Sequence, residues 1–226
     1  MIMEYLDGED LNDHLASNKP LDIAVIESFF LQIIDAVIYA HSQNVLHRDI
    51  KPSNIILGET GNKLIDFGIA HISGQTKTLT FGDREGSTPF SSPEHFTIRP
   101  NPKMDVFSAA ATLAFAAKGS SIWKGENELQ LMRSINEDSP NLEGLNENQI
   151  KFLLPLLEKN PSDRPTAKAA YESAIGYIEF LIGKSKKPAP LKGKSLSRKL
   201  IQSKKTYAAL GTLDRKSTRL NSSHAN

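Results

Sequence analysis

The feature that most constrains this chain is the run HRDIKPSN at residues 47–54, followed shortly by Asp66-Phe67-Gly68. Five fixed residue types at such offsets would arise by chance at roughly one position in a million. The run places a carboxylate (Asp49), a lysine (Lys51) and an amide (Asn54) on a loop between apolar segments, and Asp66 adds a second carboxylate. Hard oxygen ligands bind the Mg²⁺ that bridges phosphates, and a carboxylate can orient an attacking hydroxyl. The run therefore predicts a site for metal-bound phosphates.

The composition excludes several classes of protein. The 226 residues suit one large domain or one and a half small ones, and the absence of cysteine excludes a disulfide framework, a thiolate nucleophile and a cysteine-based zinc site. Acidic residues appear at once at the N-terminus, so no signal peptide is expected. The longest uncharged run of small apolar residues, 108–117, is too short to span a bilayer. We expect a cytoplasmic protein.

The net charge of +1 conceals an asymmetry along the chain. Residues 1–182 carry 15 Lys/Arg and 25 Asp/Glu, whereas residues 183–213 carry nine Lys/Arg and no acid. The acidic excess argues against nucleic acid as a partner of the folded part. Residues 183–213, rich in Gly, Ser, Pro and Lys, are predicted to be a disordered basic linker. Such a segment is either a solvated spacer or the cytoplasmic flank of a membrane anchor or sensor domain in a longer parent.

The final residues form a separate case. Residues 214–224 read DRKSTRLNSSH, which equals the translation of a common short-read sequencing adapter over eleven consecutive codons. The alternative is an ordinary polar tail. We expect residues 214–226 not to be native, and no inference about fold or function rests on them.

Hydrophobic periodicity predicts a mainly helical body with short strands. The run 25–42 has apolar residues at helical spacing and contains no Gly or Pro. Further helices are predicted at 104–118, 126–136, 147–159 and 166–182, with Thr166 as the cap of the last. Short strands are predicted at 45–46, 55–57 and 63–65. Residues 69–103 are expected to form a long, functional loop.

The run at 47–54 resembles the catalytic loop of protein kinases, and Asp66-Phe67-Gly68 resembles their metal-binding loop. The resemblance covers residues 1–182 and is similar in style to bacterial members. It implies a mainly α fold with short strands (α+β), in which residues 1–10 are a hinge-like segment and residues 11–182 are the large C-terminal lobe. Lys51, two residues after Asp49, resembles serine/threonine kinases rather than tyrosine kinases. The implied substrates are the Ser/Thr hydroxyls of proteins.

The resemblance also implies a role for each polar residue of the two loops. Asp49 would orient the substrate hydroxyl, and Lys51 would place a positive charge beside the transferred phosphoryl group. Asn54 and Asp66 would hold Mg²⁺, the cation that accompanies ATP. Capping or turn-forming roles are the plain alternatives for Asp49, Asn54 and Asp66.

Residues 1–10 resemble the hinge that joins the two kinase lobes. Backbone groups of Glu4 and Leu6 would bond the adenine of ATP, and Asp10 stands where the family has its ribose-binding acid. Ile56 would form the floor beneath the adenine. Short apolar-acidic runs are common, so an ordinary segment is the alternative.

The remaining family-like positions are structural or regulatory. His47 is expected to pack internally rather than act as a base. Arg48 would dock a phosphate carried by a loop threonine, for which the candidates are Thr76, Thr78 and Thr80, with an unmodified loop as the alternative. Ser87 would bridge the catalytic aspartate and lysine. Three further residues resemble structural positions of the family: Glu94 and Arg164, expected to form a buried ion pair, and Asp105, expected to hold the backbone of the catalytic loop.

A complete protein kinase also has a Gly-rich loop over the phosphates, a strand lysine and a helix glutamate. All three would precede the hinge, and the sequence contains none of them. Three explanations compete: a truncated gene prediction, a natural lobe-only binding module, and a decayed kinase. The first is favoured because of the adapter-like sequence at the other end of the chain, and the intact catalytic residues argue against decay. We expect the chain as written to show no measurable phosphoryl transfer and weak ATP binding, and a non-catalytic, kinase-like interaction module is the rival interpretation.

Overall fold

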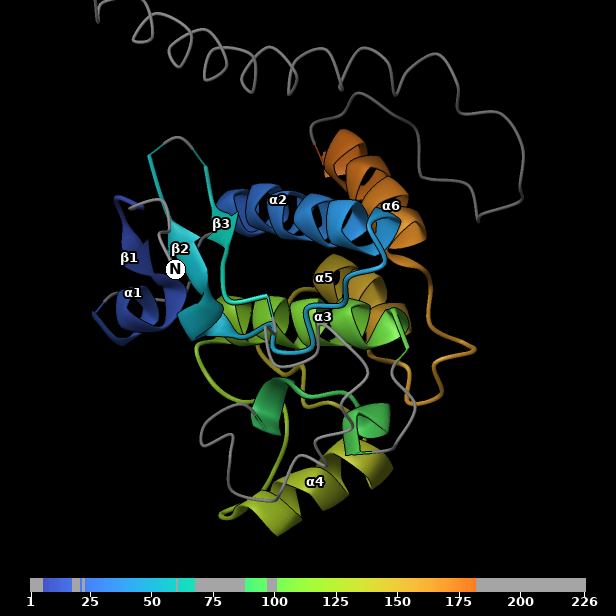
Figure 1. Ribbon diagram of the computed structural model, residues 1–226. Helices are drawn as coiled ribbons and strands as arrows, with labels where there is room; N and C mark the ends of the chain where they lie inside the picture. Colours follow the sequence, from blue (N-terminus) through green and yellow to red (C-terminus); the bar gives the residue numbers. More distant parts are fainter. Residues whose placement is uncertain are drawn as a thin grey trace, which may run out of the picture. The chain divides into compact units, whose positions relative to one another are not determined.

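The centre of the fold is a pair of long helices, α2 (Ile23–Ser42) and α3 (Lys103–Lys118), which pack against each other (Figure 1). The computed structural model describes residues 6–17, 21, 23–59, 61–67, 88–96 and 101–181. The helix predicted over 25–42 is confirmed as α2. Its buried residues recur at the spacing of one helical face: Phe29, Phe30, Ile33, Ile34 and Val37.

A left-handed turn ends α2 and decides the path of the next residues. Asn44 has a φ of 57°, its N–H donates to the carbonyl of His41 (3.0 Å), and the N–H of Val45 donates to the carbonyl of Ala40 (2.9 Å). These two bonds make a Schellman motif, which satisfies the last carbonyls of the helix. The strand predicted at 45–46 is wrong, because the N–H of Val45 closes this turn instead of joining a sheet.

Helix α3 is buried nearly all round, as expected for a helix at the centre of a lobe. Small alanine side chains let neighbouring elements approach its backbone closely: Ala109, Ala110, Ala111, Ala114 and Ala116 are buried. The helix ends at Gly119, which takes the left-handed conformation (φ 74°) and donates its N–H to the carbonyl of Phe115 at 2.7 Å. Glycine suits this position because it has no Cβ to clash.

The remaining helices surround this pair. α6 (Ala167–Leu181) packs against α2 and α3, and α5 (Glu147–Leu153) packs against α6. The Oγ1 of Thr166 accepts a hydrogen bond from the N–H of Ala169 at 3.2 Å, so the predicted cap is confirmed. The helix predicted over 147–159 is only partly confirmed: it ends at Leu153 and continues as a 3₁₀ turn, η5 (Leu154–Leu157). Pro155 explains the change, because it lacks the N–H that an α-helix needs.

A small antiparallel sheet lies beside the helices, in the order β1 (Glu9–Asp10), β2 (Ile55–Leu57) and β3 (Lys63–Leu64). β2 and β3 were predicted, whereas β1 lies within the residues expected to resemble a hinge. The short helix α1 (Leu11–Ser17), which follows β1, was not predicted. Gly8 permits the close approach of β1 and β2, because a Cβ there would lie 2.3 Å from the carbonyl oxygen of Leu57.

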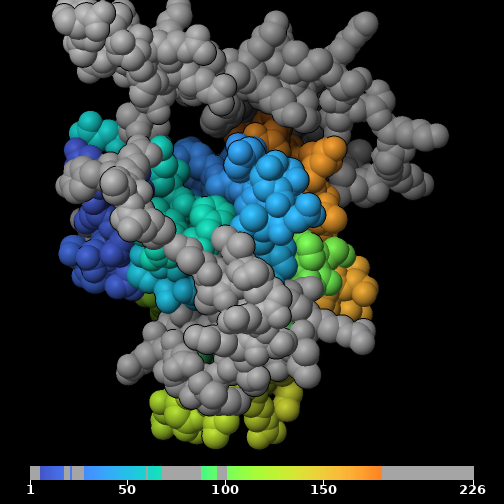
Figure 2. Space-filling view, viewed as in Figure 1, coloured from blue at the N-terminus to red at the C-terminus, as the bar shows by residue number. Residues whose placement is uncertain are grey.

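The stretch predicted to be a loop, 69–103, is described only in part. Its described residues include two 3₁₀ turns, η3 (Thr88–Phe90) and η4 (Pro93–Phe96), and α3 begins at Lys103. Helix α4 (Glu128–Glu137) packs near these two turns. In the space-filling view, α4 lies at the lower edge, and the blue to cyan residues of α2 to β3 form the surface higher up (Figure 2). Among the described helices, none has the length and apolar character needed to cross a bilayer.

Candidate active site

The catalytic-loop candidates converge on the carboxylate of Asp49. The Nζ of Lys51 lies 3.0 Å from Oδ2 of Asp49, and the side-chain nitrogen of Asn54 donates both to this Oδ2 (3.1 Å) and to the backbone carbonyl of Asp49 (2.8 Å). The side chains of Lys51 and Asp49 remain 19% and 28% exposed. Two donors thus fix the orientation of a carboxylate that solvent and a substrate can still reach.

Backbone hydrogen bonds join the two predicted site loops. The 3₁₀ turn η1 (Pro52–Asn54) leads directly into β2, and the N–H of Ile65 donates to the carbonyl of Asn54 at 2.9 Å. Asp66, the next residue, is exposed and has a φ of 57°, in the left-handed region that a non-glycine residue rarely adopts. Asn54 and Asp66 are therefore brought to the same edge of the small sheet, although they lie on different loops.

The donor set at this edge suits Mg²⁺. The amide nitrogen of Asn54 is directed to Asp49, so a cation would be bound by its Oδ1, and Asp66 would add a carboxylate. Within the described ranges no group of three or more His, Asp or Glu residues is arranged to hold a metal ion. A site with one amide and one carboxylate matches the preference of Mg²⁺, which takes its other ligands from phosphates and water.

His47 is a neutral, structural imidazole. It is fully buried, its Nε2 bonds the carbonyl of Ile65 (2.8 Å), and its Nδ1 receives the N–H of Asp49 at 3.3 Å. A carbonyl can only accept and an N–H can only donate, so the proton sits on Nε2. Burial lowers the pKa of His47 below its ordinary value, against the raising effects of the Ile65 carbonyl and nearby carboxylates. The ring also lies against Phe67, with 4.6 Å between centroids.

Asp105, on α3, holds the backbone of the catalytic loop through hydrogen bonds. Its Oδ2 accepts the N–H of His47 (2.9 Å) and the Nε2–H of His41 (2.8 Å), and its Oδ1 accepts the N–H of Arg48 at 2.8 Å. Asp105 is only 1% exposed, so these three donors compensate a carboxylate that has lost its water. The contact also supports Arg48 in its left-handed conformation, with a φ of 66°.

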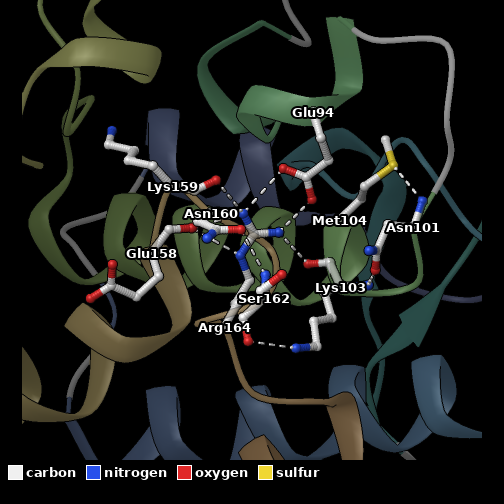
Figure 3. Close-up of polar contacts among 9 residues, drawn as sticks. All are labelled: Glu94, Asn101, Lys103, Met104, Glu158, Lys159, Asn160, Ser162 and Arg164. Carbon is white, nitrogen blue, oxygen red and sulfur yellow. Dashed lines mark hydrogen bonds and ion pairs between the residues drawn. The ribbon is translucent and has the colours of Figure 1, made fainter.

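Arg164 ties the loop after η5 to η4. Its Nη1 and Nη2 bond the two carboxylate oxygens of Glu94 (2.6 and 3.1 Å), so the expected ion pair is present and bidentate (Figure 3). The remaining donors reach the carbonyls of Lys103 (2.7 Å) and Glu158 (2.8 and 3.1 Å). Arg164 is 1% exposed. A guanidinium suits this position because its planar fork can serve several acceptors at once.

The other candidates lie apart from this cluster or outside the described residues. Leu6 precedes the sheet, and Asp10 and Ile56 are paired across β1 and β2. The Oδ1 of Asp10 accepts the N–H of Asp13 (2.9 Å), which caps the start of α1. The following candidates lie outside the described residues: Glu4, Thr76, Thr78, Thr80 and Ser87.

Two supporting residues were missed by the sequence analysis. His41 binds Asp105 from the last turn of α2, and Thr112 on α3 donates to the carbonyl of Ser108 (2.8 Å) and lies 3.4 Å from that of Ile50. A histidine in the final turn of a buried helix was a visible signal for His41. Nothing in the local pattern marks Thr112, because its partner at Ile50 lies 62 residues away.

Comparison with known proteins identifies the family to which this helical lobe and its two bonded loops belong. The protein kinase domain family matches residues 1–175, and the chain belongs to this family. The fold is also similar to the crystal structure of Rad53 1–466 in complex with AMP-PNP, with a TM-score of 0.63, 25% identity, and coverage of 76% of this chain and 45% of that one.

Serine/threonine-protein kinases are among the curated relatives of the chain. It is 31% identical over 177 residues to serine/threonine-protein kinase PkaA of Streptomyces coelicolor, covering 74% of this chain and 32% of that protein. It is 32% identical over 199 residues to serine/threonine-protein kinase PknK of Mycobacterium tuberculosis, covering 84% of this chain and 18% of that protein. The chain thus spans a third or less of the length of these relatives.

Proposed function

We propose that the protein transfers the γ-phosphoryl group of ATP to Ser/Thr hydroxyls of other proteins, with Asp49 as the residue that orients the hydroxyl. The observation that carries this proposal is the fixed, partly exposed carboxylate of Asp49, bonded by Lys51 at 3.0 Å and Asn54 at 3.1 Å. A carboxylate held in this way can accept the hydrogen of a substrate hydroxyl and aim its oxygen at phosphorus.

Lys51 has two effects in this arrangement. Its ammonium group holds the carboxylate of Asp49 in place at 3.0 Å, and it puts a positive charge where negative charge is redistributed during transfer. Asn54 holds the backbone and side chain of Asp49 through one amide nitrogen, and its Oδ1 is proposed as a ligand of Mg²⁺ together with Asp66. Bound Mg²⁺ would neutralise the phosphate charge.

The nucleotide would lie along the small sheet. Glu4 and Leu6 are proposed to bond the adenine through their backbone, and Ile56 to form the floor beneath it. Asp10 uses Oδ1 to cap α1 at 2.9 Å, so a ribose hydroxyl would be bound by Oδ2. These assignments rest on the family resemblance and on the pairing of Asp10 with Ile56.

Arg48 is proposed to receive a phosphate from the loop that contains Thr76, Thr78 and Thr80. Supporting this, its Nε is a buried nitrogen without a hydrogen-bond partner among the described residues. A phosphate oxygen would satisfy this donor and neutralise the guanidinium. Ser87 is proposed to bridge Asp49 and Lys51 through its hydroxyl.

The test is to express the protein with any in-frame coding sequence found upstream of residue 1 and to measure phosphoserine and phosphothreonine on a protein substrate by mass spectrometry. Asp49→Asn is expected to lower the transfer rate by about 10²–10⁴-fold, the usual contribution of a positioned proton acceptor. Asp13→Asn, which changes an exposed acid outside the catalytic loop, is the control. Transfer that survives Asp49→Asn contradicts the mechanism, and no transfer by the unaltered protein favours an interaction module.

A further inference from the structure

Lys159 links the loop that contains Arg164 to helix α4. Its Nζ donates to the carbonyl of Ile135 in the last turns of α4, and the same Nζ lies 3.9 Å from the ring centroid of Trp123. The carbonyl end of a helix carries partial negative charge, and the face of an indole attracts cations. Both partners therefore favour a cationic side chain at position 159.

Each of the two cations of this loop lies over one ring of a stacked aromatic pair: Lys159 over Trp123 and Arg164 over Phe107. The ring of Trp123 is stacked on that of Phe107, with an interplanar angle of 5° and 6.0 Å between centroids. The guanidinium carbon of Arg164 lies 4.9 Å from the Phe107 centroid. The side chains of Trp123 and Phe107 are 4% and 0% exposed, so this pair of rings is shielded from solvent and closely packed.

The first turn of α4 holds the residues at the start of η3. The Oγ1 of Thr88 donates to a carboxylate oxygen of Glu128 at 3.0 Å, and Thr88 is only 7% exposed. Near the end of α4, the Oγ of Ser134 accepts the N–H of Lys124 (3.1 Å), which fixes the loop carrying Trp123. An α-helix transmits such a restraint along its axis because each turn is bonded to the next.

We propose that Lys159 is a positioning residue for residues 88–96: it anchors α4, and α4 holds Thr88 through Glu128, while Arg164 holds Glu94 directly. The loop that carries Lys159 and Arg164 thus restrains both ends of this segment. The proposal rests on the proposed function in so far as residues 88–96 help to place the protein substrate. Its contacts exist whether or not the chain transfers phosphate.

The environment of Lys159 makes this anchor titratable. The pKa of Lys159 is lowered to about 8, chiefly by burial and also by the neighbouring Arg164, while the carboxylates of Asp138 and Glu158 oppose the change. Below pH 8 the side chain is a cation over Trp123, and above it the attraction to the ring is lost. Trp123 is the only tryptophan of the sequence, so its fluorescence reports on this contact.

Hydrogen exchange followed by mass spectrometry tests the anchor. Lys159→Met is expected to speed exchange in residues 88–96 and in the last turn of α4 by about tenfold at pH 7, the change expected for loss of one hydrogen bond from a charged group. The matched control is Lys151→Met, which removes an exposed ion pair with Glu147 and is expected to change exchange less than about twofold. Unchanged exchange at 88–96 in Lys159→Met overturns the proposal.

Two further variants keep the test decisive. Lys159→Arg retains the charge and is expected to restore slow exchange, and in the unaltered chain the Trp123 emission is expected to titrate with a midpoint near pH 8 that both substitutions of Lys159 abolish. If Lys159→Met does not fold, Thr88→Val breaks the opposite end of the link and should release residues 88–96 without altering the Trp123 titration. A titration that persists in Lys159→Arg contradicts the assignment. Neither measurement depends on catalysis, so failure of phosphoryl transfer alone would leave this proposal standing.

Discussion

The catalytic loop and residues 88–96 are each bonded by a buried charged side chain from a distant part of the chain, Asp105 and Arg164 respectively, but through different atoms. Asp105 accepts backbone N–H groups of His47 and Arg48. Arg164 instead takes the side chain of Glu94 as its partner. A loop held by its backbone keeps its side chains available for chemistry, whereas a segment held by a side chain uses that residue for structure. Asp49 and Lys51 lie on the catalytic loop, which is the segment held through its backbone.

The two anchors also differ in how their charge is compensated. The charge of Arg164 is neutralised by a carboxylate, and its other donors reach backbone carbonyls. The carboxylate of Asp105 instead accepts hydrogen bonds from two backbone N–H groups and from the imidazole of His41. Removing one member of a buried ion pair leaves an isolated charge, which costs more than the loss of one hydrogen bond.

The largest effect is therefore expected at Arg164. Arg164→Met should lower the free energy of unfolding by about 3–5 kcal/mol, because the carboxylate of Glu94, which is 10% exposed, would lose the guanidinium that neutralises it. Urea denaturation followed by circular dichroism measures this change, with the exposed Lys168→Met as the control. The double variant Arg164→Met with Glu94→Leu should recover much of the loss. A double variant as unstable as the single one would contradict this account.

A smaller effect is expected at Asp105. Asp105→Asn replaces one acceptor oxygen by an amide nitrogen, so a backbone N–H loses its acceptor at a cost of about 1–3 kcal/mol. Hydrogen exchange should accelerate at His47 and Arg48 and remain unchanged at residues 88–96, which would show that the two anchors act separately. Asp163→Asn, at an exposed position, serves as the control. Faster exchange in both segments would show that the two anchors are coupled.

At Ser92 a substitution is expected to raise the free energy of unfolding instead of lowering it. Ser92 is fully buried, and its Oγ has no hydrogen-bond partner among the described residues. Ser92→Ala removes this uncompensated hydroxyl and should raise the free energy of unfolding by about 1 kcal/mol. Thermal unfolding monitored by calorimetry measures the shift, and Ser120→Ala at an exposed position should have little effect. Destabilisation by Ser92→Ala would indicate a bond to this hydroxyl.

The smallest effect is expected in how the free energy of unfolding depends on pH below about 6.5. Burial lowers the pKa of folded His47, so as pH falls below about 6.5 the unfolded chain takes up this proton first and stability declines. At higher pH both states are neutral at this residue, and the contribution is complete. Histidine NMR shifts between pH 5 and 8 should show His47 titrating below the ordinary histidine value of 6.5. A His47 resonance that titrates at or above 6.5 would exclude the buried neutral state.

The helices were the most predictable part of the fold, because their apolar spacing is a local property. The run 25–42 identified α2, and Thr166 identified the start of α6. The errors fall where a local pattern met a competing bond: Val45 closes the turn after α2, and Pro155 ends α5 early. β1 and α1 were missed, since two residues of strand and a short helix carry too little periodicity to detect.

The sequence by itself determined the chemical inventory: the aspartates, the lysine and the amide of the two loops, and the helices that carry them. The resemblance of these residues to a family also pointed to Asp105, Glu94 and Arg164. Only the tertiary structure decided that Asp105 reaches the catalytic loop across 57 and 58 residues, that His47 is neutral, and that Lys159 lies over Trp123. Spacing and propensity act between near neighbours, whereas the compensation of a buried charge depends on which distant groups the packing brings within hydrogen-bond reach.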